Sequence, residues 1–237
     1  TCMKRVLLLT ACINCDGMPF TNLNNAETRK RQYIDALTFY LRYTSENIVF
    51  VENSGTDISS LFKGYQDRIE FLCFNGNSFF DKRKGKGYGE ALILEYAMAN
   101  SNFITSDTLI FKLTGRLQLI NINRLLKYVD KFERTSVYIA PPQNCSVDSR
   151  CFISNKAYLE NIFLKKKHFI NDSKGYYFEH LLFDTLNDNI DSIRVHKIPF
   201  FLHWEGISAS LGDKIRKPKF RYWSDIKVLY NCVVSKL

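Results

Sequence analysis

The sequence lacks several features that mark particular classes of protein. No apolar run reaches the roughly 18–20 residues that a membrane-spanning helix needs. The 7 cysteines are scattered and odd in number, which favours a reducing compartment over a secreted disulfide framework. The start, KRVLLLTAC, resembles a lipoprotein signal, but its apolar part spans only Val6 to Leu9, short of the about 7–15 residues of a signal peptide. We therefore expect a cytoplasmic protein whose first apolar run is a core strand.

What the chain does contain is positive charge and aromatic rings. Lys and Arg number 33 against 24 Asp and Glu, which gives a net charge of +9, and aromatic residues make up 14%. This charge favours an anionic partner, such as nucleic acid, a phosphorylated metabolite or a membrane surface. No linker, repeat or low-complexity tract divides the 237 residues, so we expect a single domain.

Strands alternate with helices along the first part of the chain. Continuous apolar runs predict buried parallel strands at 5–13, 47–55, 69–74 and 107–115. Helical spacing predicts helices between and after them, at 26–44, 90–101 and 121–132. This alternation is typical of a Rossmann-like α/β sheet.

Beyond residue 135 the predicted elements are mixed. Strands are expected in SVYIAPP, SRCFISN and IRVHKIPFFLHWEG, and helices in KAYLENIFLKKKHF and YYFEHLLFDTLN. We divide the single domain into a nucleotide-binding-like half, a mixed half and a basic-aromatic segment, at 1–134, 135–213 and 214–237.

One predicted core strand carries cations. In FKLTGRLQL, residues 111–119, side chains alternate between faces, so Lys112, Thr114 and Arg116 share one face. A buried cation without a partner is costly, so an anion should lie against this strand. That anion is either a protein carboxylate, such as Glu90 or Glu95, or a ligand.

A glycine- and lysine-rich stretch, DKRKGKGYG at 81–89, is predicted to be a loop that opens the next helix. Such a loop can hold phosphate on free N–H groups and on the positive end of the helix dipole. It matches neither the P-loop nor the dinucleotide fingerprint. Because its helix leads into the cationic strand, Lys86, Lys112 and Arg116 are expected to converge on one anion. We favour a ligand over a structural ion pair, since the glycines permit close approach.

Three further motifs have both a functional and a structural interpretation. Glu179 and His180 lie near a helix start, where either could be a general base or a surface and capping residue. HWEGISASLG places His203 and Glu205 in a loop after a strand, a common place for binding residues or simply a turn. CINC has C-x-x-C spacing, which we interpret as chance because no second pair exists.

The segment DKIRKPKFRYWSDIK, residues 213–227, interleaves cations with aromatic side chains. This pattern suits an anionic membrane surface, and it also suits single-stranded nucleic acid. A solvated basic tail is the structural alternative.

The order of these motifs resembles a known family. Five motifs follow one another over nearly the whole chain: RKRQYIDAL in the first helix, a strand ending in VENSG, the KGYGEA loop, KLTGR and a late GISASLG loop. This order is similar to that of the small glycosyltransferases of bacterial capsule and lipopolysaccharide gene clusters, which have a GT-A-like fold. The resemblance implies one mostly parallel, mixed sheet flanked by helices.

The resemblance also implies a reaction and partners. A sugar would pass from a nucleotide sugar, most often UDP- or CMP-linked, to a lipid-linked or oligosaccharide acceptor. The protein would work in the cytoplasm or at the inner face of the membrane, with peripheral contact through 214–227 and no nucleic-acid partner.

Site residues follow from the same resemblance. The nucleotide and its phosphates would be bound by Thr10, Ala11, Asn14, Arg29, Glu52, Asn53, Lys112, Thr114, Gly115 and Arg116. The sugar or its phosphates would be bordered by Lys86, Gly87, Gly89 and Glu90. The catalytic candidates are Glu179, placed first, then His180 and Asp148. The acceptor would meet His203, Glu205, Gly206 and Ser208.

The chain departs from the family pattern at the metal site. Most GT-A enzymes hold a divalent ion with an Asp-x-Asp motif after the fourth core strand, and this sequence contains no such motif. At the corresponding place it has Lys112 to Arg116. A leaving phosphate needs positive charge but does not require a metal to supply it. We therefore expect a metal-independent transferase without a cofactor.

Two other classes of function remain open. The first is a nucleic-acid-binding or processing protein that uses the basic surface. The second is a non-catalytic domain of the same fold that binds a nucleotide or a glycan.

Overall fold

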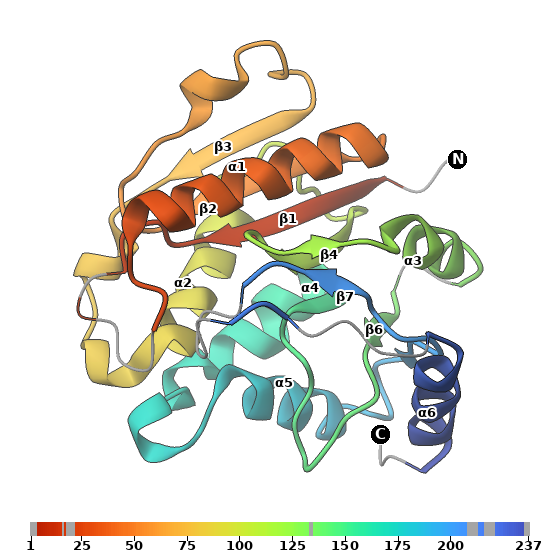
Figure 1. Ribbon diagram of the computed structural model, residues 1–237. Coiled ribbons are helices and arrows are strands. Elements are labelled where there is room, and N and C mark those ends of the chain that lie inside the picture. Colours follow the sequence, from red (N-terminus) through yellow and green to blue (C-terminus); the bar gives the residue numbers. More distant parts are fainter. Residues whose placement is uncertain are drawn as a thin grey trace.

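The computed structural model describes residues 4–15, 17, 22–132, 135–207, 213–215 and 221–234, and the side chains of 221–223 are not described. The described residues form a seven-stranded sheet in the order β3-β2-β1-β4-β7-β6-β8, with helices on both faces (Figure 1). The sheet runs through both halves of the chain, which confirms the expected single α/β domain with a mixed, mostly parallel sheet. The boundaries within that domain stay a prediction.

The first half supplies the parallel strands that the apolar runs predict. They are β1 (Arg5–Ala11), β2 (Asn47–Glu52), β3 (Ile69–Cys73) and β4 (Leu109–Thr114). β1 lies between β2 and β4, and all three neighbouring pairs are parallel. Because the chain moves outward from β1 to β3 and then returns to β4, the strand order reverses between β1 and β4. In sheets of this type, ligands bind outside the carboxyl ends of the strands at that reversal.

The second half makes the sheet mixed. β7 (Cys151–Asn155) pairs antiparallel with β4 and with β6 (Val137–Ile139), and β8 (Val195–Lys197) closes the edge parallel to β6. The single strand expected over 193–206 is wrong. Its end, β9 (Trp204–Glu205), leaves the main sheet and pairs with β5 (Gln118–Leu119). Pro199 lies between the two pieces, and proline cannot donate to a strand ladder.

Two helices cover one face of the sheet. α1 (Ala26–Tyr43) begins where the Asn25 side chain accepts a hydrogen bond of 2.8 Å from the Thr28 N–H. Its buried stripe packs with α3 (Ile122–Val129) against alternate side chains of β1 and β4, such as Leu7 and Phe111.

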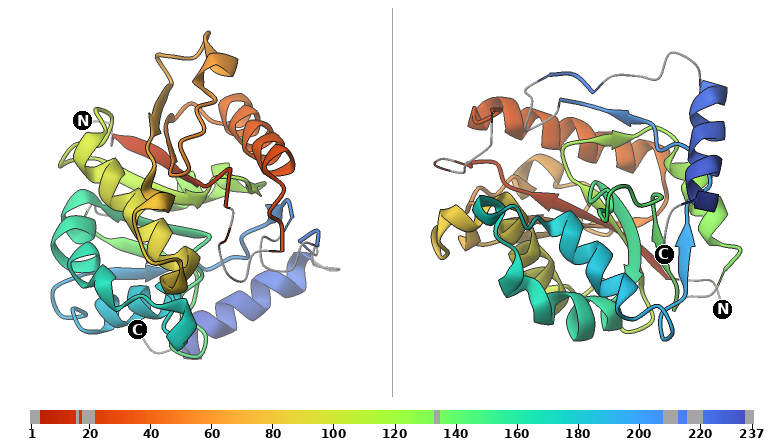
Figure 2. Two further views of the ribbon diagram at one scale, coloured as in Figure 1. Left: turned by 90° about the vertical axis from the view of Figure 1, so that its left-hand side faces the viewer. Right: turned by 90° about the horizontal axis from the view of Figure 1, so that it is seen from below.

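The opposite face is covered by α2 (Gly85–Asn100), α4 (Lys156–Tyr158) and α5 (Phe178–Asn187). Figure 2 shows α1 and α2 on opposite sides of the sheet. The helix expected over 156–169 continues from α4 through a π turn (Leu159–Phe163) and a 3₁₀ turn (Leu164–Phe169). Shorter 3₁₀ turns lie at Ser59–Phe62, Gly76–Ser78, Lys82–Lys84 and Asp172–Lys174.

The glycine-rich stretch corrects one expectation. It is not a loop, because α2 already begins at Gly85 and takes up the following glycines as its first turn. Gly85 itself has φ 82°, a left-handed conformation that glycine adopts without strain.

The C-terminal segment contains a further helix, α6 (Arg221–Val234), which the sequence analysis did not predict. Asp225 fixes it to the body: one carboxylate oxygen accepts from Arg124 Nη1 of α3 at 2.9 Å, and the other accepts from the Phe201 N–H at 2.9 Å. Among the described helices, α6 included, none is long and apolar enough to cross a membrane.

Candidate functional site

A cavity of about 540 Å³ lies where the strand order reverses. Thr10 and Ala11 at the end of β1, and Thr114 at the end of β4, form part of its wall. The first turns of α1, α2 and α5 complete it, together with the segment before β7 and residues 213–215. The cavity therefore sits at the position that the topology favours for a ligand.

The structure brings many of the expected site residues together. The cavity is lined by Thr10, Ala11, Arg29, Asn53, Lys86, Gly87, Gly89, Glu90, Thr114, Arg116 and Glu179. As far as the wall is described, it does not include Asn14, Glu52, Lys112, Gly115, Asp148, His180, His203, Glu205 or Gly206. Ser208 lies outside the described residues, as do Arg216, Lys217, Lys219 and Phe220 of the basic segment.

Arg29 enters the cavity from the first turn of α1. Its Nε and Nη2 donate to the Cys12 carbonyl at 2.8 and 2.6 Å, and its Nη1 donates to the Leu23 carbonyl at 3.1 Å. These bonds join α1 to the loop after β1. Arg29 thus combines a structural role with a position in the cavity wall.

Arg116 follows β4 and lies beside Arg29. Its side chain is 8% exposed, and Nη1 donates to the Ile207 carbonyl. Burial lowers the pKa of Arg116 below its ordinary value, and the nearby Arg29 charge acts in the same direction. No carboxylate of the described residues forms an ion pair with Arg29 or Arg116. Two buried guanidinium groups without a carboxylate favour an anion in the cavity.

Lys112 corrects another expectation. It is fully buried, its Nζ forms an ion pair with Glu90, and it also donates to the Ser149 carbonyl at 2.5 Å. Lys112 therefore lies beneath the cavity and not in its wall. The sequence left two anions open as partners of Lys112, a protein carboxylate or a ligand. The structure shows that the partner is the protein carboxylate of Glu90. Glu90 also accepts from Thr10 Oγ1 at 3.0 Å, so Lys112 and Thr10 together orient this carboxylate.

The start of α2 has a protein carboxylate against it. The carboxylate of Asp172 approaches this turn, and the Gly87 N–H donates to its Oδ2 at 3.4 Å. A Cβ on Gly87 would lie 3.1 Å from Asp172 Oδ1, and a Cβ on Gly85 would collide with the carboxylate. The glycines do permit a close approach, but by a protein carboxylate.

Acidic side chains occupy the same end of the cavity. Glu179, in the first turn of α5, accepts from Ser149 Oγ at 2.5 Å. Asp172 is buried in the wall, and this burial raises the pKa of its carboxyl group. Lys86 lines the same cavity, and burial lowers its pKa, although the charges of Asp172 and Glu179 oppose that shift. Asp172 was missed because NDSKGYY carries no signal beyond a turn.

Several expected nucleotide-binding residues serve the loops around the cavity. Glu52 accepts from the Ile13 N–H at 2.8 Å and from the Ser54 N–H at 2.9 Å, which satisfies its buried carboxylate. Asn14 is exposed and donates through its N–H to Ser54 Oγ at 2.9 Å. Gly115 lets two strands meet closely, since a Cβ there would lie 2.7 Å from the Thr10 carbonyl oxygen.

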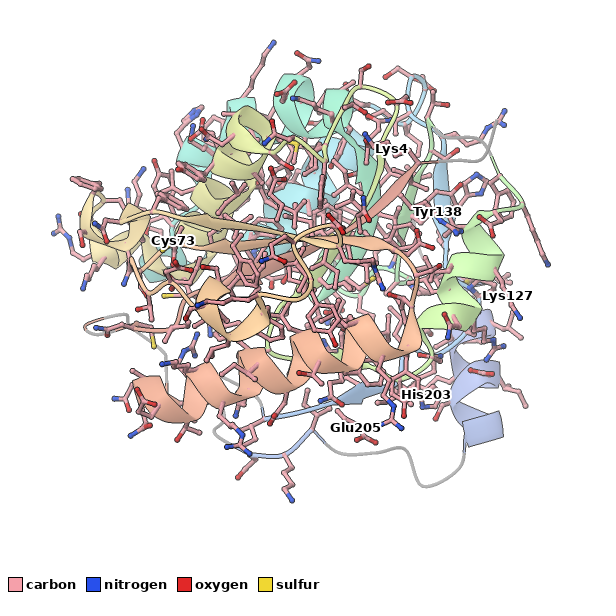
Figure 3. All side chains as sticks on the ribbon, turned by 90° about the horizontal axis from the view of Figure 1, so that it is seen from above. Lys4, Cys73, Lys127, Tyr138, His203 and Glu205 are labelled. Atoms are coloured by element: carbon pink, nitrogen blue, oxygen red, sulfur yellow. The ribbon has the colours of Figure 1, made fainter. Side chains whose placement is uncertain are left out.

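The remaining candidates lie away from the cavity wall. Asp148 accepts from Arg150 Nε with both oxygens, at 2.9 and 3.0 Å. His180 Nδ1 accepts from the Tyr177 N–H at 3.2 Å, as a cap of α5. The His203 N–H donates to Asn121 Oδ1 at 3.0 Å, and Glu205 belongs to β9. Figure 3 shows His203 and Glu205 near each other on the segment that runs alongside α1.

The cysteines and acidic residues of the described part of the chain were candidates for a metal centre. Among the described residues, no group of three His, Cys, Asp or Glu side chains is arranged to hold a metal ion. The thiols of Cys12 and Cys15 are free, and burial raises the pKa of Cys12 to about 12. A thiol with this pKa is not a ready nucleophile at neutral pH.

No family model and no curated protein sequence matches the chain. Mouse xyloside xylosyltransferase 1 in its apo form is 13% identical, over 82% of this chain and 84% of that one, with a TM-score of 0.45. A putative glucose-1-phosphate thymidylyltransferase from Bacillus anthracis, in complex with a sucrose, is 11% identical over 99% and 97%, with a TM-score of 0.49. A cytidylyltransferase from Leptospira borgpetersenii is 15% identical over 99% of both chains, with a TM-score of 0.47. With TM-scores below 0.5, none of these likenesses bears on function, which has to be argued from the cavity.

Proposed function

We propose that this protein is a glycosyltransferase that moves a sugar from a nucleotide-sugar donor to a growing bacterial surface polysaccharide, without a divalent metal ion. The observation that carries the proposal is the pair of buried guanidinium groups, Arg29 and Arg116, which line the cavity and have no carboxylate partner among the described residues. The family resemblance of the sequence supplies the reaction.

The two guanidinium groups suit the phosphates of the donor. A guanidinium keeps its charge when buried and can donate two parallel hydrogen bonds to phosphate oxygens. Only one nitrogen of Arg116, Nη1, donates to another described residue, so this group suits such bonds. Arg29 contributes its charge, because its nitrogens already donate to the Cys12 and Leu23 carbonyls. Positive charge placed where the leaving phosphate gains negative charge stabilises the transition state, as a divalent ion would. Arg29 and Arg116 supply that charge here.

Glu179 is the proposed general base. Its carboxylate lines the cavity and is held by Ser149, whereas Asp148 and His180 lie outside the described wall. In the transfer step, an acceptor hydroxyl oxygen forms the bond to the anomeric carbon and gives its proton to Glu179. The bond from that carbon to the phosphate oxygen breaks, and the nucleotide leaves with the electron pair.

A thermal-shift panel tests the proposal directly. UDP-, GDP-, CMP- and dTDP-sugars are added to the intact protein with and without EDTA. Ligand that binds only the folded state at 100 times its Kd stabilises it by about 2.7 kcal/mol, so the correct nucleotide raises Tm. We expect one nucleotide class to do so equally in EDTA. The proposal fails if no donor raises Tm, and its metal-independent part fails if the shift requires Mn²⁺ or Mg²⁺.

Two assays separate the other classes of function. Transfer or hydrolysis of the sugar nucleotide by the wild-type protein distinguishes an enzyme from a non-catalytic domain of the same fold. Binding to a labelled single-stranded oligonucleotide at increasing salt tests the nucleic-acid alternative, which predicts affinity that falls linearly on a log–log plot. We expect transfer and no oligonucleotide affinity at physiological salt.

The proposal includes peripheral contact with an anionic membrane at the C-terminal segment. The solvent face of α6 presents Ile226, Leu229, Tyr230 and Val233, exposed by 38%, 49%, 65% and 84%. These residues are spaced as one helical stripe, and Lys227 lies beside it. Cations precede the helix in the sequence, and an apolar face next to positive charge is the pattern of interfacial helices.

Liposome sedimentation tests this contact. We expect the protein to sediment with vesicles that contain phosphatidylserine more than with neutral vesicles. The variant Leu229→Glu should weaken that binding, whereas Glu95→Gln, on the surface of α2, should not. Equal sedimentation of the wild type and Leu229→Glu would mean that α6 does not contact the membrane and has a structural role alone.

A further inference from the structure

Two residues that line the cavity each have a buried side-chain oxygen with no hydrogen-bond donor among the described residues. These oxygen atoms are Oδ1 of Asn53, whose side chain is 2% exposed, and Oδ1 of Asp172, which is 5% exposed. Both residues line the cavity. An acceptor that is buried without a donor costs about 1–3 kcal/mol, so each of these atoms favours a ligand that brings a donor.

The structure holds both side chains in place through the first turns of α2. Asn53 Nδ2 donates to the Gly89 carbonyl at 3.5 Å, and Asp172 Oδ2 accepts from the Gly87 N–H. The backbone of Asn53 is fixed as well: its N–H donates to Ala11 at 3.1 Å and its carbonyl accepts from Asn77 at 2.8 Å. In each side chain one polar atom is bonded to α2 and the other is unpartnered.

The two unpartnered oxygens of this subsite suit a hydrogen-bond donor better than a phosphate. An ionised phosphate has no donor for either oxygen, and the Asp172 carboxylate would repel it. Hydroxyl groups have the opposite character, because each carries a proton to donate. A hydrogen bond from a hydroxyl to a carboxylate is charge-assisted and about twice as strong as a neutral one. The guanidinium groups of Arg29 and Arg116 come from α1 and from the turn after β4, so these two groups lie on other elements than the acceptor oxygens. Lys86 of α2 is a third cation of the wall and lies at the acidic end.

We propose that Asn53 and Asp172 form a subsite for hydroxyls of the transferred sugar, placed against the glycine turn of α2, while Arg29 and Arg116 hold the phosphates. This assignment rests on the proposed function, in which the bound molecule is a nucleotide sugar. The family resemblance left two roles open for the glycine-rich stretch, which would border the sugar or its phosphates, and this assignment favours the sugar.

The test compares a nucleotide with its own sugar conjugate. For whichever nucleotide raises Tm in the panel, calorimetry gives the Kd of the nucleoside diphosphate or monophosphate alone and of the matching nucleotide sugar. The variants are Asp172→Asn and Asn53→Ala, with Glu95→Gln as a control on the outer face of α2. Melting temperatures without ligand verify that each variant is folded.

We expect both variants to bind the nucleotide sugar more weakly than the wild type does, and to bind the free nucleotide as tightly as the wild type does. The loss of the charge-assisted bond in Asp172→Asn should raise the Kd of the conjugate about tenfold, and Asn53→Ala should raise it about threefold to tenfold. A deoxy-sugar form of the same donor should bind the wild type and the affected variant equally. Glu95→Gln should change neither Kd.

The outcomes separate this inference from the proposal beneath it. One contrary result is that both variants raise the Kd of the free nucleotide as much as that of the nucleotide sugar, and another is that they raise neither Kd. Either result means that the assignment of the sugar subsite is wrong, although the protein binds nucleotide sugars. If the wild type binds no nucleotide and no conjugate, the proposed function itself is wrong.

Discussion

Strand β4 and the turn that follows it each carry a buried cation, and the two cations have different partners. Lys112, inside the strand, is paired with Glu90 of α2 and bonded to a carbonyl. Arg116, four residues later, is bonded to a carbonyl and faces the cavity beside Arg29. A buried cation in a sequence therefore predicts an anion nearby, but not whether that anion belongs to the protein.

The end of the strand decides the difference. Within β4 the face that carries Lys112 is covered by α2 and α5, so a carboxylate of the covering layer can reach the ammonium group. Past Thr114 the strand ends, Gly115 turns the chain, and Arg116 reaches the cavity. We expect loss of the Lys112 side chain to lower the stability of the fold, and loss of the Arg116 side chain to weaken the interaction with the ligand.

The largest effect should come from Lys112→Met. Removal of the ammonium group leaves the Glu90 carboxylate without its ion-pair partner, and the breaking of a buried pair from one side costs about 3–5 kcal/mol. Urea denaturation of the variant should show this loss of unfolding free energy.

The matched control is the double variant Lys112→Met with Glu90→Gln. Because it removes both charges, it should recover a large part of the stability lost in the single variant. A single variant as stable as the wild type would contradict the assignment of Lys112 to a structural pair. The readout is stability alone, because Glu90 also lines the cavity.

Arg116→Ala should show the opposite behaviour. Without this guanidinium the leaving phosphate loses a preorganised charge, and kcat should fall about 10²- to 10³-fold. The unfolding free energy should change by about 1 kcal/mol or less, because no buried carboxylate is left behind. Steady-state kinetics and urea denaturation of one preparation measure both quantities.

Arg116→Lys is the control for geometry. Lysine keeps the charge but cannot donate two parallel bonds, so activity should recover only in part. A variant Arg116→Ala that keeps full activity but unfolds easily would contradict the comparison of the two cations.

The sequence predicts the sheet well because its strands are governed by local apolar patterns. The runs at 5–13 and 47–55 lie at the centre of the sheet, where burial on both faces demands continuous apolar residues, and they form β1 and β2. The prediction of a single strand over 193–206 was wrong for a different physical reason. Its apolar residues are buried, but the two ends pair with strands from different parts of the chain.

The cavity was predictable only in part. Arg116 lies just after a predicted strand and Glu179 near the start of a predicted helix, whereas Arg29 was expected in the pocket only from the family resemblance. Asp172 could not be found this way, because its carboxylate reaches α2 through a contact between segments 85 residues apart. A sequence alone also does not show that a carboxylate lies against the start of α2, so the phosphate role expected for that turn stays a prediction.

Asp172→Asn should show how far the buried carboxylate of Asp172 lowers the stability of the folded protein. Burial raises the pKa of Asp172, so the folded state retains a proton at a higher pH than the unfolded state. The contribution of this group to stability is therefore fully present below the pKa of the unfolded chain and is lost as pH rises through the folded pKa. The variant has no such loss, so its Tm without ligand should exceed that of the wild type at about pH 7.5.

The pH series provides the control within the same experiment. The difference in Tm should shrink as pH falls towards the ordinary pKa of Asp, about 3.9. A difference that grows as pH falls would mean that the ionised carboxylate stabilises the fold, contrary to the direction argued from its burial.

The smallest effect is expected for His180, the neighbour of the proposed base. Its imidazole caps α5 through the Tyr177 N–H and does not reach the described cavity wall. His180→Ala should lower the unfolding free energy by about 1 kcal/mol through the lost cap and leave kcat within about twofold. In the same assay Glu179→Gln should lower kcat about 10²- to 10⁴-fold, because it removes the proposed proton acceptor. If His180→Ala lowered kcat as much as Glu179→Gln and shifted its pH profile, the base would be the imidazole. The first turn of α5 would then have to move so that His180 faces the cavity when substrate binds.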